Sequence, residues 1–501
     1  MKKYIINIIK YLIVGIFTLY FLSCSDFLDL NPLDQISSEV FWQNEKQVDM
    51  ALSGVYASLY SGYFNYGMAD FDIMAGDYNE SGFSGLKLLA QGQIEPTSGS
   101  LVSGIYSSTY RSISGCNFFL DNVDQAPLDE EVINEYKAEV LFLRSLFYFT
   151  LTQHYGGVPL YLKQVTIDEA LVKQSSKATV IAQVLSDLDF AIAHLPNISY
   201  DGHAVKASAL ALKARVLLFE EQWEEAATTA NQIITDGIFS LYDNFRDLFL
   251  KRGQIGNPEI IFSTRYQEPD CYSELDIGWQ MVGSINPRQE LVDAYECTDG
   301  LPITSSPLYD PTNWKLNRDP RLVLTIKNYE DSAYTSDGRA IAYAYLHTST
   351  SGYSPVKYCD WDKMPCDYNT LSNQDWILLR YADVLLMYAE AKNEASGPDA
   401  SVYQAINEVR ARPGVDMPPI PEGLTKEEMR TLIRHERRVE FASEGLRWGD
   451  IKRWRTAEDY IPTLVDEGGT QRQFDPTKHY LLPFPQSEMD INDKLEQNPG
   501  Y

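Results

Sequence analysis

Apolar side chains recur at helical spacing along much of the chain. In residues 181–195 they fall three or four positions apart without a break, and Pro196 follows directly, which predicts a helix that ends there. Residues 138–152 are apolar on nearly all sides, and this pattern indicates a helix buried all round. Gly156 and Gly157 mark its end.

Two further stretches are typical of antiparallel helix pairs. Residues 206–234 contain a turn near Glu221, and residues 381–409 contain one at Gly397-Pro398. Alanines on the facing sides allow two helices to approach closely, and the spacing resembles a tetratricopeptide helix pair. A third long helix is predicted to begin at Thr425, with Glu428 completing a capping box. Such pairs bury their faces only against neighbours, so we expect them to stack into a curved scaffold.

Two segments break this helical pattern. Residues 61–105 are rich in Gly, Ser and Tyr, and residues 265–375 are rich in turns and aromatic side chains. The run at 259–262 has the composition of a short strand. The predicted fold is therefore mainly α, with tetratricopeptide-like helix pairs and a loop-rich irregular part that contains short β segments. We divide it into an N-terminal region, 24–260, and a C-terminal region, 261–501.

The N-terminus has the pattern of a lipoprotein signal peptide, residues 1–23. Lysines at 2, 3 and 10 precede an apolar run at 11–22, which is shorter than the roughly 20 residues that span a bilayer. Ser23 precedes Cys24, and a lipid on the Cys24 thiol plus acylation of its amine would anchor the chain stably. Because Phe21 is an imperfect residue for such a cleavage site, an ordinary secretory signal with a chance cysteine is the alternative. No other stretch is long and apolar enough to span a membrane.

Composition and charge limit the kinds of function that the chain can have. The apolar fraction of 44% supports a substantial core and not disorder. The formal net charge is −28, which argues against a nucleic-acid partner because such partners require basic patches.

The cysteines give no metal or redox pattern. Five remain after Cys24, and none forms a CxxC pair. Cys359 and Cys366 are close enough to form a disulfide if the intervening loop folds back, which export would permit. Buried free thiols are the alternative.

No catalytic motif is present. The chain lacks GxSxG, HExxH, GxxxxGK[ST] and GxGxxG patterns, and its six histidines have no metal-ligand spacing. We therefore expect a protein that is not an enzyme and that has no cofactor. Asp70, Asp72 and Asp77 could hold a structural calcium ion, but their spacing is not that of an EF-hand loop.

A dense mixed-charge segment runs from Arg434 to Glu444, with Arg447, Asp450 and Arg453 beyond it. It could be an anion site. The interpretation we favour is a network of ion pairs that ties this helix to its neighbours.

Motifs along nearly the whole chain resemble the SusD/RagB family of outer-membrane nutrient-binding lipoproteins. The residues that carry the resemblance are Cys24-Ser-Asp-Phe-Leu-Asp-Leu-Asn-Pro, Phe41-Trp42, Ala138–Phe149, Tyr155–Leu160, Ala209–Ala226, Leu291–Tyr295, Asp299-Gly300, Asn317–Leu322, Leu379–Leu385, Glu436–Phe441, Gly445–Trp448, Tyr480–Gln486 and Gln497–Tyr501. The resemblance implies a lipid-anchored, cell-surface protein of the outer membrane. Such a protein binds a glycan or another nutrient, such as a peptide, without catalysis, and passes it to a SusC-like TonB-dependent transporter. A structural or adhesion module without a small ligand is the alternative.

Candidate ligand-binding residues come from the two irregular segments, where the resemblance places the ligand. Sugars stack on flat aromatic faces, and short polar side chains bind their hydroxyl groups. The candidates are Tyr63, Tyr66, Asp77, Tyr78 and Asn79 in the first segment, and Tyr266, Tyr272, Trp279, Trp314 and Trp361 in the second. Packing in the core is the alternative for each of them.

Overall fold

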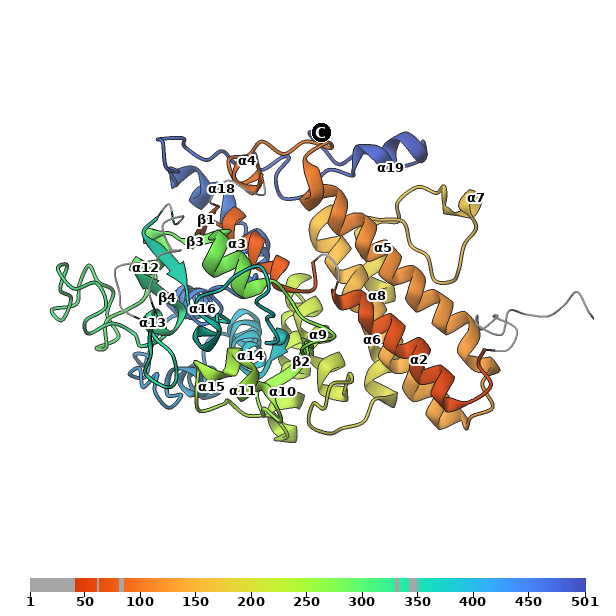
Figure 1. The fold of residues 1–501 in the computed structure, drawn as a ribbon, viewed down its shortest axis with the longest axis horizontal. Helices are drawn as coiled ribbons and strands as arrows, with labels where there is room; N and C mark the ends of the chain where they lie inside the picture. Colours follow the sequence, from red (N-terminus) through yellow and green to blue (C-terminus); the bar gives the residue numbers. More distant parts are fainter. Residues whose placement is uncertain (1–40, 61–62, 81–84, 329–332, 342–348, 350) are drawn as a thin grey trace, which may run out of the picture.

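The computed structural model describes residues 41–60, 63–80, 85–328, 333–341, 349 and 351–501. The predicted signal peptide and Cys24 lie outside the described residues. Long helices dominate, as predicted from the hydrophobic pattern (Figure 1). They are α2 (Glu45–Tyr56), α5 (Gly99–Asn122), α6 (Glu130–Tyr155), α8 (Lys177–His194), α9 (Lys206–Phe219), α10 (Trp223–Asp236), α14 (Tyr381–Ser396), α15 (Ala400–Arg410) and α16 (Lys426–Glu440).

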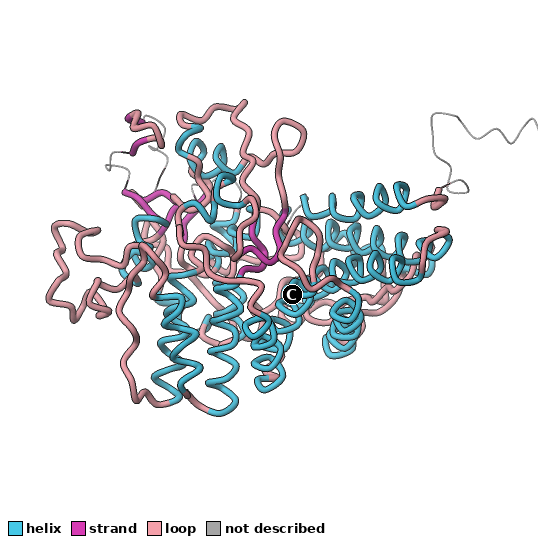
Figure 2. Tube along the Cα trace, turned by 90° about the horizontal axis from the view of Figure 1, so that it is seen from below, coloured by secondary structure: helices cyan, strands magenta, loops and turns pink. Residues whose placement is uncertain are grey.

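These helices pack in sequence order into a continuous frame. Contacts run from α5 to α6, then through α8, α9 and α10 to α14, which packs against both α15 and α16. Figure 2 shows many of them as rows of roughly aligned helices, with the short strands gathered among loops in one half of the molecule. The predicted helix-pair frame with an irregular part is therefore confirmed. Helix α10 packs against α14, so the helical frame continues across the boundary predicted between residues 260 and 261. The division into two regions at that boundary stays a prediction.

Local capping explains where several helices begin and end. The Ser176 hydroxyl accepts from the Thr179 N–H at the start of α8, and α8 ends just before Leu195 and Pro196. Thr425 and Glu428 form the capping box predicted for α16. The turn between α9 and α10 is made by residues 220–222, as expected.

The strands are short and all pair antiparallel. In the described residues β1 (Tyr78–Glu80) pairs with β3 (Ile285–Pro287), β4 (Ile326–Asn328) with β7 (Tyr353–Pro355), and β5 (Ala333–Tyr334) with β6 (Ala340–Ile341). The strand predicted at 259–262 is β2 (Ile260–Thr264), which pairs with β8 (Trp376–Arg380). This pair joins segments more than a hundred residues apart.

One boundary differs from the prediction. Helix α5 begins at Gly99, inside the segment 61–105 that was expected to be irregular. Glycines and serines at its start have low helix propensity and obscured the pattern, but Val102, Ile105 and Tyr106 are buried together on one face. Across the ranges that the structure describes, no helix has the length and apolar character needed to cross a membrane.

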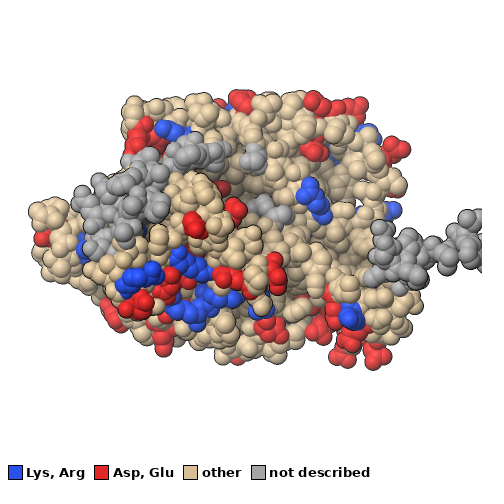
Figure 3. Space-filling view, viewed as in Figure 1, with Lys and Arg blue, Asp and Glu red and all other residues tan. Residues whose placement is uncertain are grey.

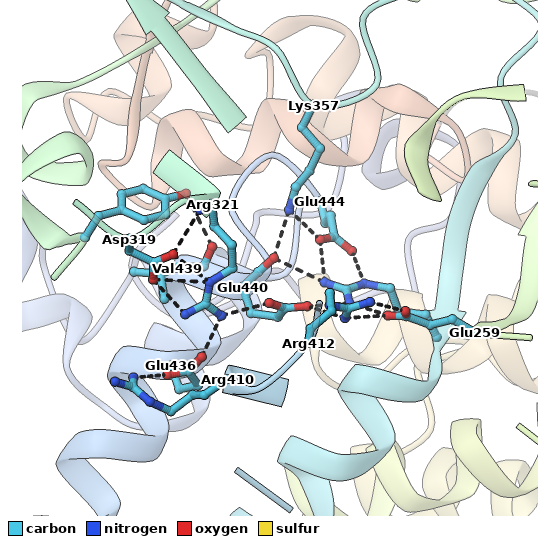
Figure 4. Close-up of polar contacts among 12 residues, drawn as sticks. Glu259, Asp319, Arg321, Lys357, Arg410, Arg412, Glu436, Val439, Glu440 and Glu444 are labelled. Atoms are coloured by element: carbon cyan, nitrogen blue, oxygen red, sulfur yellow. Dashed lines mark hydrogen bonds and ion pairs between the residues drawn. The ribbon is translucent and has the colours of Figure 1, made fainter. Parts of the chain in front are cut away.

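The mixed-charge segment forms a buried ion-pair network, so the structural interpretation of Arg434–Glu444 is confirmed (Figure 4). Glu440 on α16 lies at its centre and accepts from Arg321, Arg380 and Arg412 over 2.8–3.1 Å. Burial by itself would raise the pKa of the Glu440 carboxyl, but these guanidinium groups hold it well below its usual value. The network therefore fixes α16 against the irregular part.

Candidate functional site

A cleft of about 470 Å³ opens where the helical frame meets the irregular part. Its wall comes from the C-terminal end of α2, the short helix after it, the 202–203 turn, the end of β2 and residues 265–271 (Figure 1). The lining residues are Ser53, Tyr56, Ala57, Leu59, Tyr60, Gly202, His203, Lys251, Ser263, Thr264, Arg265, Tyr266, Gln267, Asp270 and Cys271.

Tyrosine rings form one side of this cleft. The Tyr60 and Tyr266 ring centroids are 5.5 Å apart at an interplanar angle of 47°. Tyr60 keeps 42% of its surface exposed, whereas Tyr266 is buried and its N–H donates to Asp375 Oδ1 over 2.8 Å. Next to Cys271, Tyr272 is 47% exposed. The cleft therefore offers accessible aromatic surface on a fixed backbone.

Polar side chains also line this cleft. His203 Nδ1 lies 3.0 Å from Glu139 Oε2, and the hydrogen bond to this carboxylate raises the pKa of His203. Arg265 Nη1 donates to the Asp201 carbonyl over 2.9 Å. The remaining N–H groups of Arg265 can donate to a ligand hydroxyl.

The charges around the cleft are balanced. Lys251 Nζ lies 2.7 Å from Asp375 Oδ1, and Arg252 Nε lies 2.8 Å from Asp247 Oδ1. Blue and red atoms accordingly interleave at the lower left of Figure 3, over the region of helix α11 (Lys251–Gln254). Balanced charge suits a neutral, hydroxyl-rich ligand.

Three of the predicted candidates lie at or near this cleft. Tyr266 lines it, and Tyr272 is the next residue after the lining residue Cys271. Tyr66 is half-buried beside Gly278. The pKa of Tyr266 is raised chiefly by burial, and the nearby Tyr66 raises it further. Tyr63 points elsewhere, since its ring makes edge contacts with Phe64, Phe71 and His154.

Tyr78 and Trp279 are core residues in this structure. Both are 0% exposed. The Tyr78 hydroxyl is hydrogen-bonded to Ser443, and the Trp279 ring packs edge-on against Trp376 at 6.1 Å. Protein atoms surround both side chains, and a role for either residue as a ligand contact stays a prediction.

Asp77 and Asn79 hold the fold together. Asp77 is buried and its Oδ1 accepts from Arg438 Nε over 3.0 Å, whereas Asn79 Oδ1 accepts from Arg288 Nη1 over 2.6 Å. Asp72 Oδ2 accepts from the Gly445 N–H. The described part of the chain contains no group of three or more His, Cys, Asp or Glu side chains that could hold a metal ion. Asp70, Asp72 and Asp77, which were considered for calcium, therefore do not form such a group.

Trp314 and Trp361 lie away from the cleft lining. The Trp314 ring packs edge-on against Tyr353 at 5.5 Å. Arg246 and Lys327 each lie 5.5 Å from the centroid of the Trp361 ring. Both tryptophans are half-buried, and their role as ligand contacts stays a prediction.

The cysteines Cys359 and Cys366 are buried free thiols, so the disulfide considered from their spacing is absent. Cys359 Sγ accepts from Gln280 Nε2 over 3.0 Å, and Cys366 Sγ lies 3.2 Å from Met364 Sδ. Each sulfur thus has a separate partner.

Sequence reasoning missed Tyr60, His203 and Arg265 as cleft residues. Tyr60 lies one residue before the irregular segment, His203 lies in the loop between α8 and α9, and Arg265 directly follows β2. The available signal for Tyr60 was its position, directly before the Gly-, Ser- and Tyr-rich segment that begins at residue 61.

Comparison with known proteins identifies the family. Residues 257–501 match the SusD family, and residues 26–218 match the family described as starch-binding associating with outer membrane. The SusD-like protein P38 of Formosa agariphila is 29% identical over 506 residues, which cover 96% of each chain.

Two solved structures extend this likeness to the fold. A SusD-like carbohydrate binding protein from Bacteroides fragilis has a TM-score of 0.82 at 26% identity, covering 91% of this chain and 100% of the other. A laminarin binding SusD-like protein has a TM-score of 0.71 at 25% identity, covering 92% and 100%.

This chain belongs to the SusD family. The resemblance drawn from its motifs is confirmed over nearly the full length. The family consists of binding proteins without catalytic activity, which confirms the expectation that the chain is not an enzyme.

Proposed function

We propose that this protein is a surface-exposed lipoprotein of the bacterial outer membrane that captures an oligosaccharide and delivers it to a SusC-like TonB-dependent transporter. The ligand class is supported by the cleft at Tyr60 and Tyr266, which combines aromatic surface with hydrogen-bonding groups. It is also supported by family members whose names describe them as carbohydrate-binding and laminarin-binding.

The cleft has suitable dimensions for a glycan. Small-molecule sites commonly enclose about 300–1,000 Å³ and combine apolar walls with a few polar groups that fix orientation. At about 470 Å³ this cleft falls in that range. We assign the sugar-stacking role to Tyr60 and Tyr272 because both are exposed, and the hydroxyl-binding role to Arg265, Gln267 and Asp270.

The location and partner follow from the family and the N-terminus. A lipid on Cys24 would hold the chain at the membrane, and the family description that matches residues 26–218 includes association with the outer membrane. A binding protein tethered beside a transporter raises the local ligand concentration at its entrance.

Two experiments test the two halves of this proposal. A glycan array with the purified chain should give sub-millimolar binding to at least one neutral glycan. A peptide that binds in its place would favour a peptide-binding member of the family, and the absence of any ligand would favour an adhesion or structural module.

Purification from the natural host in mild detergent tests the partner. During growth on the inducing nutrient, a large outer-membrane β-barrel should copurify with the protein. A Cys24→Ala variant should lose membrane attachment and serves as the control. Recovery of the protein without any such barrel would contradict the transport role.

A further inference from the structure

A second cleft, of about 660 Å³, lies between the end of α6, the α9–α10 turn, helix α17 (Arg447–Arg453) and residues 476–481. Its lining includes five basic and two acidic side chains, although the whole chain carries a net charge of −28. The basic residues are Lys177, Lys452, Arg453, Arg455 and Lys478, and the acidic ones are Glu220 and Glu221.

Three of the five basic residues are neutralised by carboxylates. Lys177 Nζ lies 2.6 Å from Glu220 Oε1, Arg453 binds Glu390, and Lys478 lies 3.2 Å from Glu95. These pairs leave two basic residues, Lys452 and Arg455, to be accounted for.

Lys452 and Arg455 have no ion-pair partner in the described part of the chain. Lys452 is only 9% exposed, and its ammonium donates to the Gln153 carbonyl over 2.6 Å. The Arg455 guanidinium carbon lies 4.0 Å from the centroid of the Tyr480 ring. Burying an ammonium without a counter-charge is costly, and Lys452 therefore has a pKa lowered by burial to about 7.

An unpartnered polar atom lies in the same wall. Gln153 Nε2 is buried and forms no hydrogen bond with the described residues. Two basic side chains without a carboxylate partner and one free donor thus lie around one hollow, a set that an anionic, acceptor-rich group would satisfy. Tyr480 and Phe219 add aromatic surface.

We propose that this second cleft binds an acidic saccharide through a carboxylate or sulfate group held by Lys452 and Arg455. This site is separate from the cleft at Tyr60, and its existence does not depend on the function proposed for that cleft. A saccharide fits better than an acidic peptide because the anion-binding groups sit beside aromatic surface in a hollow of saccharide size.

Calorimetric titration of the full chain tests this site. The probes are trisaccharides bearing glucuronate, galacturonate or sulfate, each with its neutral counterpart. At least one acidic probe should bind, and Arg455→Asn should weaken it about tenfold, as expected for the loss of one charge-assisted contact. Asn tolerates the positive φ of 54° at this position, so the backbone should be unchanged.

A variant that is expected to bind the acidic probe more tightly separates effects on binding from effects on structure. Glu221 lines the cleft, and the described residues include no ion-pair partner for it, so Glu221→Gln should strengthen acidic binding about threefold by removing repulsion. Lys46→Gln, an exposed change on α2, should have no effect.

Three results would overturn the proposal. One is that no acidic probe binds. Another is that Arg455→Asn and Glu221→Gln both bind the acidic probe as the unaltered chain does. The third is that an oligoglutamate peptide displaces the acidic probe, which would indicate a protein ligand. Tyr60→Ala should leave binding of the acidic probe unchanged. A failure of the function proposed for the first cleft can therefore be distinguished from a failure of this proposal.

Discussion

The Arg380 guanidinium donates from Nε to Glu444 Oε2 over 2.8 Å, and both side chains are buried. Arg380 ends strand β8, whereas Glu444 follows α16. The contact therefore joins the sheet to the C-terminal helices. Arg380 also binds Glu259 and Glu440, so one guanidinium contacts three buried carboxylates.

Replacing Arg380 with Met should destabilise the fold strongly. Removing one partner from a buried ion pair costs about 3–5 kcal/mol, because the remaining charges lose their compensation. Chemical denaturation at pH 7 measures the loss. Lys173→Met is the matched control, since Lys173 and Glu496 form an exposed pair and such pairs contribute about 0–1 kcal/mol. Equal losses in both variants would contradict the assigned role of the network.

The network should also make stability depend on pH. The pKa of Glu440 and that of Asp383 lie below their ordinary values because arginines outweigh the effect of burial. Carboxylates of this kind stabilise the fold above their unfolded pKa, about 4, and that stability is lost as the pH falls further. The free energy of unfolding should therefore decrease steadily from pH 5 to pH 3.

The Glu440→Gln variant provides the control for this dependence. It should be much less stable than the unaltered chain at pH 7, and the difference should shrink below about pH 4. Denaturant titrations at several pH values test this. A difference that stays constant down to pH 3 would show that Glu440 does not have a lowered pKa.

Gly445 should tolerate no side chain. Its φ is +74°, and a Cβ there would lie 2.5 Å from the Met68 carbonyl oxygen. Gly445→Ala combines this clash with a left-handed backbone cost of about 1–2 kcal/mol. Gly423, at φ +78° with open space around it, isolates the backbone cost. Thermal unfolding should show a larger loss for Gly445→Ala than for Gly423→Ala, and equal losses would rule out the clash.

Trp279→Ala should reduce stability much more than Tyr60→Ala. Removing a fully buried Trp costs about 3–5 kcal/mol through lost contacts and the cavity that remains. Tyr60 is 42% exposed, so its removal should lower the melting temperature much less. A Trp279→Ala variant that melts like the unaltered chain and binds glycan more weakly would instead identify Trp279 as a ligand contact.

The helical frame could be predicted because its signals are local. The apolar spacing in 181–195 and the Thr425–Glu428 capping box depend on neighbouring residues only, and both appear as expected. The Gly- and Ser-rich start of α5 was missed because its helix is stabilised by packing and not by propensity.

The site was harder to predict because exposure is a property of the tertiary structure. Trp279 and Tyr272 are aromatic residues seven positions apart in one loop-rich segment, yet one is in the core and the other is exposed. The buried position of Trp279 depends on Trp376 from strand β8, nearly a hundred residues away. Composition can indicate that such loops carry aromatic ligand contacts, but it cannot select among them.

The central claim is that the cleft at Tyr60 binds a glycan, and calorimetric titration of Tyr60→Ala tests it most directly. The unaltered chain should bind at least one neutral oligosaccharide with a dissociation constant below about 1 mM, corresponding to about −4 kcal/mol. Tyr60→Ala should weaken that binding about tenfold, whereas Trp314→Ala, outside the cleft, should leave it unchanged. Equal affinity for the unaltered chain and Tyr60→Ala would contradict the assignment of this cleft.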